Sequence, residues 1–343
     1  MAKHIVIGSN SFSGQDFIDL LLDDPSNEVI GISRSSEYPD YFLRYKQREN
    51  LTNYSFQKFD LNLEMPQFLE FLDTTEPQTI TNFAAQSEVA PSWENPDQWF
   101  QTNCVSLASL VKHLSERDYL DRYLHISSPE VYGSCESLVT ETSPVNPSTP
   151  YAASKAAADM LLKSFAEYKG FPLVTVRATN VYGARQQLFK IMMRTSIFIR
   201  LNRRIPLHGG GQAVKSYIHI RDVSKGEKVV LERGRLGEIY HLSPEKGIRV
   251  RDVVAALANA MGKRLEDVAE DVEERLELDV GHLAVQDHLP RDVEGRARKA
   301  ARLTFPIVVQ AAAREDELRA DARAQMQKVF GEMQEMRREL QEA

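Results

Sequence analysis

Residues 4–14 read HIVIGSNSFSG, a short strand pattern followed at once by a loop of small residues that opens a helix. Gly8, Ser11 and Gly14 stand three positions apart, a spacing that permits a tight turn and a close approach of the backbone to a pyrophosphate. The phosphates would lie at the positive N-terminus of the helix. The loop predicts a dinucleotide site, although serine replaces the middle glycine of the usual pattern. Its candidate contacts are Gly8, Ser11, Phe12, Ser13 and Gly14.

Strand and helix patterns alternate outward from this loop through the first half of the chain. The expected helices cover residues 16–22, 99–114 and 152–168. The expected strands cover residues 4–7, 28–32, 54–59, 79–83, 123–127 and 173–177. Such alternation requires crossover connections and predicts an α/β fold, a Rossmann-type doubly wound parallel sheet with helices on both faces. Sheets of this kind bind ligands beyond the carboxyl ends of their strands.

A different pattern begins near residue 181. A basic helical stretch at 188–204, a glycine turn at 209–211 and a helix at 250–262 predict a smaller α/β substrate-binding domain, to which we also assign a strand at 216–220. In the tail, an apolar stripe from Leu318 to Leu340 at three- and four-residue steps predicts an amphipathic helix. The expected domains are 1–180 for dinucleotide binding, 181–275 for substrate binding with interleaved segments, and 276–343 for an atypical charged helical tail.

Composition excludes several classes of partner. The 343 residues carry a formal net charge of −7, so the chain lacks the basic excess of a general nucleic-acid binder. The two cysteines and eight histidines show neither a disulfide framework nor metal-ligand spacing. No apolar run approaches the ~18 residues of a membrane span, and the N-terminus has no secretory signal pattern. We therefore expect a cytoplasmic protein with no metal, nucleic-acid or membrane partner.

The ends of the second and third strands bear on the choice of cofactor. An NAD site usually carries an acidic residue at the end of the second strand, where it accepts a bond from the ribose 2′-hydroxyl. This chain instead has Arg34 flanked by Ser33 and Ser35, a set that suits a 2′-phosphate. The pattern favours NADP, with NAD as the alternative. Asp60-Leu61 ends the third strand, where a carboxylate could accept from the adenine amino group.

A candidate catalytic set of three residues lies later in the chain. Tyr151 and Lys155 stand four positions apart on one face of a predicted helix. Near an ammonium and a cationic cofactor ring, the pKa of the Tyr151 phenol should fall below its free value of ~10, so that it acts as a base near neutrality. Ser128 follows the preceding strand and could bond the same substrate oxygen. Residues 54–58 repeat the tyrosine–lysine spacing, but they lie in a predicted strand without a partner serine.

With these motifs in place, the chain resembles the extended short-chain dehydrogenases/reductases, in the branch of nucleotide-sugar epimerases and dehydratases. The resemblance covers roughly residues 3–275 and includes single matches at Ser92, Pro96 and Asn103. Its main motifs are NFAAQS at 82–87, HISSPEVYG at 125–133, PYAASK at 150–155, RATNVYG at 177–183 and KSYIHIRDV at 215–223. It implies that Ala84 and Ala85 contact the cofactor, and that the protein is a homodimer packed through the helices near 99–114 and 152–168.

The resemblance also implies a reaction. Tyr151 would take the proton from the sugar O4 while a hydride passes to the nicotinamide, with Lys155 holding the nicotinamide ribose and Ser128 bonding O4. Glu130 stands where dehydratases of this family carry the carboxylate that removes the C5 hydrogen and expels water from C6. Return of the hydride gives a 4-keto-6-deoxy sugar. Among the activities of this family, we therefore expect that of a nucleotide-sugar 4,6-dehydratase before the others.

Other outcomes stay open at this point. Pro129 replaces an aspartate typical of dTDP-glucose 4,6-dehydratases, so the resemblance is closer to GDP-mannose 4,6-dehydratases at this position. UDP-glucuronate decarboxylases also carry a glutamate at the position of Glu130, whereas similar 4-epimerases often do not. Decarboxylation and then epimerisation are the alternatives. A non-catalytic NADP-binding sensor would usually have lost the tyrosine or the lysine.

A nucleotide-diphosphate sugar brings two phosphates, so an acidic protein needs a local group of cations. Lys215 stands where relatives often have arginine, which keeps the charge but weakens bidentate binding of phosphate. The resemblance places these residues at the substrate: Ser87, Glu130, Asn180, Lys190, Lys215 and Arg275.

Overall fold

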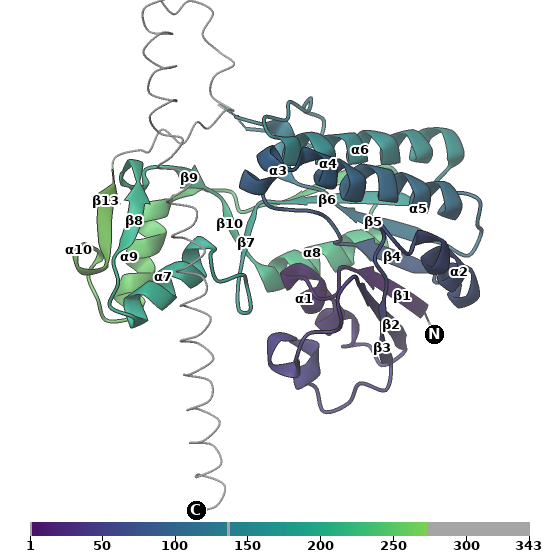
Figure 1. Cartoon of the computed structure of the whole chain (residues 1–343), viewed down its shortest axis with the longest axis horizontal. Coiled ribbons are helices and arrows are strands. Elements are labelled where there is room, and N and C mark those ends of the chain that lie inside the picture. Colours follow the sequence, from purple (N-terminus) through teal and green to yellow (C-terminus); the bar gives the residue numbers. More distant parts are fainter. Residues whose placement is uncertain (1, 136–137, 273–343) are drawn as a thin grey trace, which may run out of the picture. The chain divides into compact units, whose positions relative to one another are not determined.

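The computed structural model describes residues 2–135 and 138–272, and its centre is a seven-stranded sheet in the order β11-β6-β5-β4-β1-β2-β3. All six neighbouring pairs in this sheet are parallel. The strands are β1 (Ala2–Ile7), β2 (Asn27–Ser33), β3 (Tyr54–Lys58), β4 (Thr79–Asn82), β5 (Arg122–Ile126), β6 (Leu173–Ala178) and β11 (Ile239–Leu242). The doubly wound parallel sheet expected from the sequence is thus confirmed (Figure 1).

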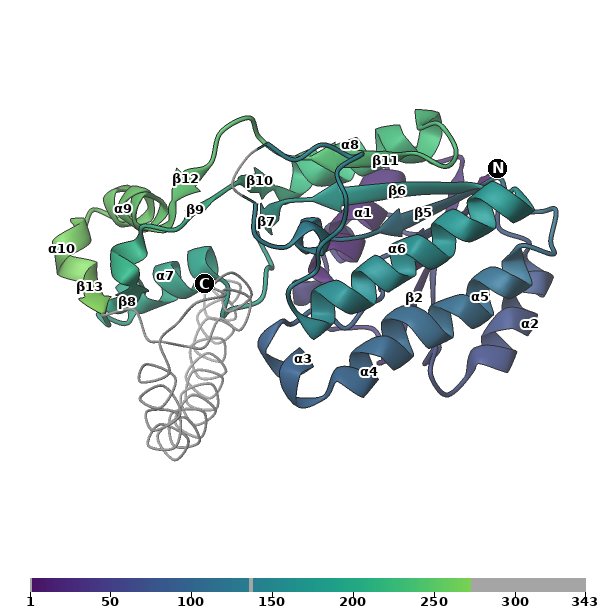
Figure 2. The same cartoon turned by 90° about the horizontal axis from the view of Figure 1, so that it is seen from above.

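Helices cover both faces of the sheet because alternate strand residues point to opposite sides. Ile5 and Ile7 pack with α2 (Met65–Thr75), α5 (Leu107–Leu114) and α6 (Pro150–Lys169) on one face. Val6, between them, packs on the other face with α1 (Phe12–Leu21) and α8 (Ile220–Arg233). Figure 2 shows α5 and α6 running side by side along one face, with α1 and α8 beyond the strands.

One predicted helix changes its winding along its length. The segment predicted as one helix at 99–114 consists of α4 (Pro96–Phe100), a π-helical stretch at Gln101–Ser106 and α5. A short helix, α3 (Ala90–Glu94), precedes it. A π-helical stretch adds a residue to the turn and often marks a functional site.

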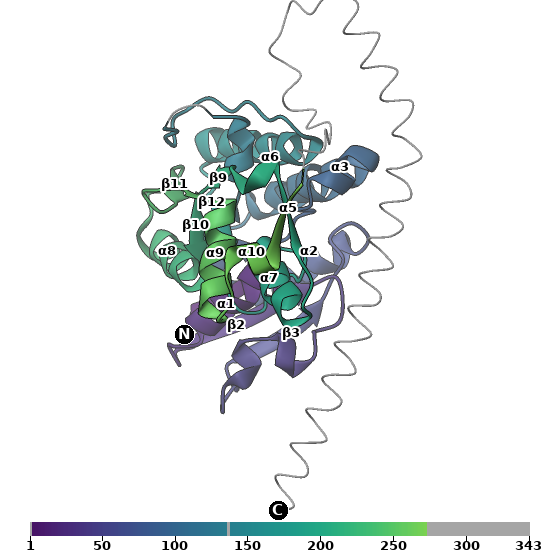
Figure 3. The same ribbon diagram turned by 90° about the vertical axis from the view of Figure 1, so that its left-hand side faces the viewer.

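A smaller group of elements follows the sixth strand. It contains α7 (Ile191–Arg200), β8 (Ile205–His208), the turn Gly209–Gly211, α9 (Val250–Ala260), α10 (Leu265–Val268) and β13 (Ala269–Val272) (Figure 3). These elements have their own apolar core around Ile205, Leu207 and Val254. Two strand pairs join it to the main sheet: β7 (Asn180–Tyr182) with β10 (Tyr217–His219), and β9 (Val214–Lys215) with β12 (Ile248–Arg249).

Segments of the two halves interleave along the chain. Residues in α8 and β11 come after position 180, yet α8 packs on α1 and β11 pairs with β6 in the main sheet. Two elements that follow residue 180 therefore belong to the main sheet, in keeping with interleaved segments. The domain bounds at 180 and 275 stay a prediction. The predicted tail helix and Arg275 lie outside the described residues.

Candidate active site

The glycine loop has the close packing that its small residues predict. Gly8 has a φ of +88°, and a Cβ there would lie 2.9 Å from the backbone nitrogen of Ala84. A Cβ on Gly14 would lie 2.4 Å from the Gly8 carbonyl oxygen. Ser11 caps α1, because its Oγ accepts a hydrogen bond from the Gly14 N–H at 2.9 Å. The loop thus brings Gly8, Ser11, Gly14 and Ala84 together at the N-terminus of a helix, where a pyrophosphate would fit.

The end of β2 is tied to this loop by Asn10. The Asn10 side-chain amide donates to Ser35 Oγ at 3.0 Å and to the Ser36 carbonyl at 2.9 Å. The Asn10 N–H donates to Ser33 Oγ at 3.0 Å. Arg34, in the middle of this segment, is exposed to solvent. The glycine loop and the segment that carries Arg34 therefore form one connected surface.

Asp60 and Leu61 follow the end of β3. Asp60 Oδ1 accepts from the Asn62 N–H at 2.8 Å, so one carboxylate oxygen already stabilises the turn into α2. Leu61 lines a small hollow together with Ala84, Lys155 and His125. Three residues predicted to bind the cofactor, Leu61, Ala84 and Lys155, therefore meet at the carboxyl ends of the strands.

Ser128 and Tyr151 are also brought together. Ser128, two residues after β5, caps a short 3₁₀ helix at Pro129–Tyr132, and its Oγ accepts from the Glu130 N–H at 3.2 Å. Tyr151 lies in the first turn of α6, and its N–H donates to Ser92 Oγ at 3.2 Å. Burial raises the pKa of Tyr151 to about 12, and hydrogen bonding with Ser128 acts in the opposite direction.

Lys155 lies one turn after Tyr151 and is buried. Its Nζ donates to the Ile126 carbonyl at 2.8 Å and lies 3.4 Å from His125 Nε2. Burial lowers the pKa of Lys155 to about 8. The lowered pKa expected for Tyr151 requires the cofactor's positive ring as well as Lys155 and stays a prediction. In the chain alone, burial outweighs the hydrogen bond from Ser128, and the described residues provide no compensating cation at the phenol. A base at this position requires positive charge to arrive beside it.

Glu130 lies among the cations that the sequence assigned to the substrate. Its side chain is exposed to solvent, yet partial burial of the carboxyl raises its pKa, while the charges of Lys215 and Lys190 lower it. Lys215 comes from β9, and Lys190 immediately precedes α7. Two lysines from the part of the chain after residue 180 thus act on a carboxyl group that follows β5 of the main sheet.

The remaining predicted substrate and cofactor residues differ in exposure. Asn180 begins β7, is exposed, and its amide lies 3.3 Å from the Ser216 carbonyl. Ser87 and Ala85 lie in the segment after β4, with Ser87 exposed and Ala85 half-buried. Phe12 is buried and Ser13 half-buried in the first turn of α1.

Three polar residues near the site were not assigned a role from the sequence. Asn103, in the π-helical stretch, donates to the Gln86 carbonyl at 3.1 Å and to Ser154 Oγ at 2.9 Å, and accepts from the Gln86 N–H at 2.9 Å. It therefore links the segment after β4 to the residue next to Lys155. His125 and Asp159 lie behind Lys155. Asn103 and His125 belong to the quoted motifs or matches, but a single sequence does not show what they contact.

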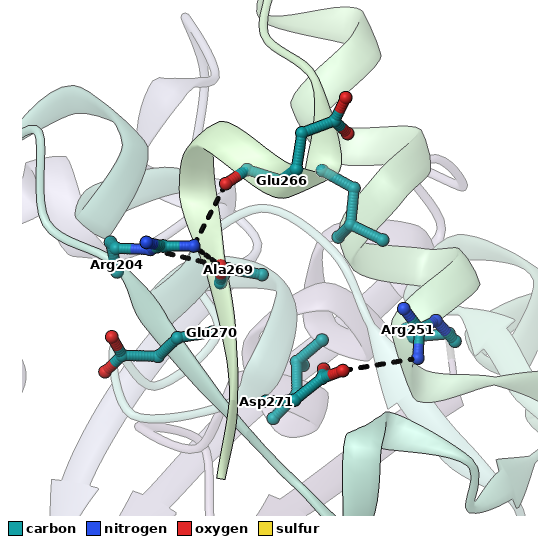
Figure 4. Close-up of a pocket in the computed structure, with 8 residues that line it drawn as sticks. Arg204, Arg251, Glu266, Ala269, Glu270 and Asp271 are labelled. Atoms are coloured by element: carbon teal, nitrogen blue, oxygen red, sulfur yellow. Dashed lines mark hydrogen bonds and ion pairs between the residues drawn. The ribbon is translucent and has the colours of Figure 1, made fainter.

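A larger hollow of about 370 Å³ lies in the smaller group of elements and is lined by none of the predicted site residues (Figure 4). Arg204 donates to the carbonyls of Glu266 and Ala269. Arg251 donates to the Gly210 carbonyl at 2.8 Å and lies 4.0 Å from Asp271. Both arginines are thus engaged in holding the local backbone.

Within the described ranges, no group of three or more His, Cys, Asp or Glu side chains is arranged to hold a metal ion. Among the same residues, no helix is both long enough and apolar enough to cross a bilayer.

The chain is similar in sequence and in structure to known nucleotide-sugar dehydratases. The sequence profile of GDP-mannose 4,6 dehydratase matches residues 5–302. A trifunctional UDP-glucose 4,6-dehydratase/UDP-4-keto-6-deoxy-D-glucose 3,5-epimerase/UDP-4-keto-L-rhamnose-reductase of Arabidopsis thaliana is 31% identical over 65% of this chain and 34% of its own length. The chain spans at most 42% of the length of the three such plant relatives.

Two further relatives match over most of their length. The dTDP-glucose 4,6-dehydratase of Xanthomonas campestris is 29% identical over 75% of this chain and 76% of its own. A double mutant of the dTDP-glucose 4,6-dehydratase DesIV from Streptomyces venezuelae, solved with NAD, is 26% identical. It superposes with a TM-score of 0.70 over 81% of this chain and 85% of its own.

Proposed function

The chain belongs to the GDP-mannose 4,6-dehydratase family of extended short-chain dehydrogenases/reductases, and on that premise we propose that it is a nucleotide-sugar 4,6-dehydratase. The observation that carries the proposal is the Glu130 carboxyl, which lies two residues from Ser128 and within the fields of Lys190 and Lys215. A carboxylate at this place can remove a proton from a carbon next to a ketone. The sugar nucleotides named for the relatives above make this substrate class the natural expectation.

The residues have separate tasks in this proposal. A nicotinamide dinucleotide held by the glycine loop would accept a hydride from C4 and later return it. Tyr151 takes the proton from O4, Ser128 donates a hydrogen bond to that oxygen, and Lys155 binds the nicotinamide ribose. Glu130 removes the C5 proton, and the proton that Tyr151 took from O4 leaves with the C6 hydroxyl as water. Glu130 then returns its proton to C5, while the hydride would return to C6. Since the pKa of the Tyr151 phenol is about 12 in the chain alone, its ionisation would require the positive charge of the bound cofactor.

NADP is the proposed cofactor. Arg34 and Ser35 are exposed, and Asn10 ties this segment to the glycine loop, so a 2′-phosphate would meet a cation and a hydroxyl. Arginine is the side chain best suited to such a group. NAD, present in the DesIV structure, is the alternative.

The substrate phosphates are assigned to Asn180, Lys190, Lys215 and Arg275, with Ser87 near the sugar. We place the enzyme in the cytoplasm and divide it at residues 180 and 275, as the sequence predicts. Exposed Val105 and Met160, in the π-helical stretch and α6, support a homodimer through these helices.

One experiment tests the reaction. The full chain is incubated with GDP-mannose, dTDP-glucose and UDP-glucuronate in turn, and the masses of the product sugar nucleotides are measured by mass spectrometry. Loss of one water from a hexose is the expected result. Loss of carbon dioxide would indicate decarboxylation, and a changed sugar of unchanged mass would indicate epimerisation. Tight cofactor binding without any conversion would favour a sensor.

A further inference from the structure

A buried group of ionisable side chains lies behind Lys155. His125 projects from β5, Asp159 follows Lys155 by one turn of α6, and Arg177 projects from β6. The exposed fractions of the three side chains are 3%, 8% and 3%. The reaction proposed above assigns no task to any of them. Burying charged groups is costly unless they are paired, so the arrangement calls for a reason.

One ring nitrogen connects the group to the candidate catalytic lysine. His125 Nε2 lies 3.4 Å from Lys155 Nζ and 3.5 Å from Asp159 Oδ1. The other Asp159 oxygen, Oδ2, accepts from Arg177 at 2.7 Å and from Ser127 Oγ at 2.7 Å. Asp159 Oδ1 and His125 Nδ1 are buried without a hydrogen-bond partner among the described residues. The carboxylate therefore binds Arg177 and Ser127 through one oxygen and presents the other to His125.

The charges on these groups follow from their surroundings. Burial and the charge of Lys155 lower the pKa of His125 to about 4, so the ring is neutral near pH 7. Burial alone would raise the pKa of Asp159, but the close approach of His125 and the charges of Arg177 and Lys155 hold it below its usual value. Asp159 is thus an anion facing a neutral imidazole and an ammonium.

Few other groups act on Lys155. The Ile126 carbonyl faces it from β5, Asp159 from its own helix, and Cys104 from the π-helical stretch. Burial lowers the pKa of Lys155, and Asp159 and Cys104 act against this. Arg177 and Ser127 reach Lys155 only through Asp159. Asp159 is therefore the main counter-charge for the ammonium within this packing.

We propose that His125 and Asp159 are positioning residues for Lys155, which hold its ammonium at the carboxyl end of β5 and keep it charged in a site closed to water. The inference rests on the proposed function, in which a charged Lys155 binds the nicotinamide ribose. His125 Nε2 accepts a hydrogen bond from the Lys155 ammonium, and the negative charge of Asp159 stabilises the protonated form of Lys155.

The first test measures cofactor affinity against pH by fluorescence titration of the intact chain, and it needs no turnover. Affinity of the unaltered protein should weaken as pH rises through about 8, where Lys155 loses its proton. In Asp159→Asn the midpoint should fall by about one pH unit or more, because a charged partner is lost. The control is Asp19→Asn, which removes another buried carboxylate bound by arginines, on α1, and should leave the midpoint unchanged. The same midpoint in Asp159→Asn and the parent would overturn the proposal.

The second test covers the case in which Asp159→Asn does not fold. In a Glu130→Gln background, formation of reduced nicotinamide reports C4 oxidation in a single turnover. His125→Phe should slow this step at least tenfold, and His125→Gln, which restores a polar acceptor, should recover most of the rate. Equal rates in the parent and both variants would contradict the positioning role. Absence of reduced nicotinamide in the parent itself would count against the proposed reaction, and the affinity measurement would still decide the role of His125 and Asp159.

Discussion

Glu130 shows how one exposed carboxylate can determine the outcome of a shared first step. Its pKa is raised by partial burial and lowered by two lysines, a balance that suits a group which takes and returns a proton. Replacement by glutamine keeps the size and removes the base. In Glu130→Gln, water loss should fall by roughly 10²–10⁴-fold while C4 oxidation continues, so reduced nicotinamide should accumulate. Absorbance of the reduced cofactor and mass spectrometry of the sugar measure the two steps separately. Undiminished dehydration would refute the assignment.

Arg34 is the residue on which the cofactor proposal depends. A charge-assisted hydrogen bond to a 2′-phosphate contributes about 1.5–3 kcal/mol, so Arg34→Ala should weaken NADP binding by at least roughly tenfold. NAD has no 2′-phosphate, and its affinity should change little. Calorimetric titration of both cofactors gives the ratio. Arg200→Ala, an exposed arginine at the end of α7, serves as the control and should alter neither affinity. An unchanged ratio in Arg34→Ala would argue for an NAD enzyme.

The residues that the sequence could indicate are those whose identity and spacing carry the meaning. Ser128, Tyr151 and Lys155 can be recognised from the sequence. Ser128 directly follows a predicted strand, and the four-residue spacing of Tyr151 and Lys155 places them on one helix face. His125 and Asp159 give no such sign. A histidine in an apolar strand and an aspartate on a helix are ordinary, and only the register of β5 against α6 brings them to Lys155.

At the scale of elements, residues 99–114 are helical as predicted, but the sequence did not indicate the π-helical winding of the stretch between α4 and α5. Its apolar residues continue the helical periodicity, whereas the change in winding places Asn103 against Gln86 and Ser154. Loss of these bonds in Asn103→Ala should lower the free energy of unfolding by about 1–3 kcal/mol, since buried partners are left unpaired. Urea denaturation measures this. Gln101→Ala, at an exposed position of the same stretch, should cost far less. Equal losses would show that the contacts of Asn103 are not special.

Helix α8 contains a buried acid that makes stability depend on pH. Glu227 is 1% exposed, its Oε2 has no partner among the described residues, and burial together with Asp16 raises its pKa from 4.5 to about 8. Between these values the folded state holds a proton that the unfolded state has lost. The free energy of unfolding should therefore fall as pH rises from about 4.5 to 8, because the unfolded state gives up this proton more readily than the folded state.

Glu227→Met should remove this dependence. The variant should be more stable than the parent by about 1–3 kcal/mol at pH 8, and the gap should close toward pH 4.5. Urea denaturation of both proteins across this range measures the difference. Glu232→Gln, an exposed position on the same helix, is the control and should follow the parent. A gap that stays constant with pH would mean that Glu227 is ionised in the folded protein.

For the whole molecule, the sequence predicted most of the main sheet and less of what completes it. Six of the seven strands are short β-branched or apolar runs between helical patterns, which local sequence suffices to indicate. The strand β11 is only four residues long, and α8 has a narrow apolar face among many charges, so neither stands out locally. Their places depend on β6 and α1, which precede them by many residues.

The interleaving of segments has a catalytic consequence, because Lys190 and Lys215 belong to the later part of the chain while Glu130 follows β5. Their charges lower the pKa of Glu130, so removing one must raise it, and the base then needs a higher pH to ionise. In Lys215→Gln, the acid limb of the pH profile for water loss should move to higher pH, and the KM for the sugar nucleotide should rise as a phosphate contact is lost. Lys246→Gln, an exposed lysine elsewhere, should leave both unchanged. A raised KM with an unmoved acid limb would mean that Lys215 binds phosphate without tuning the base.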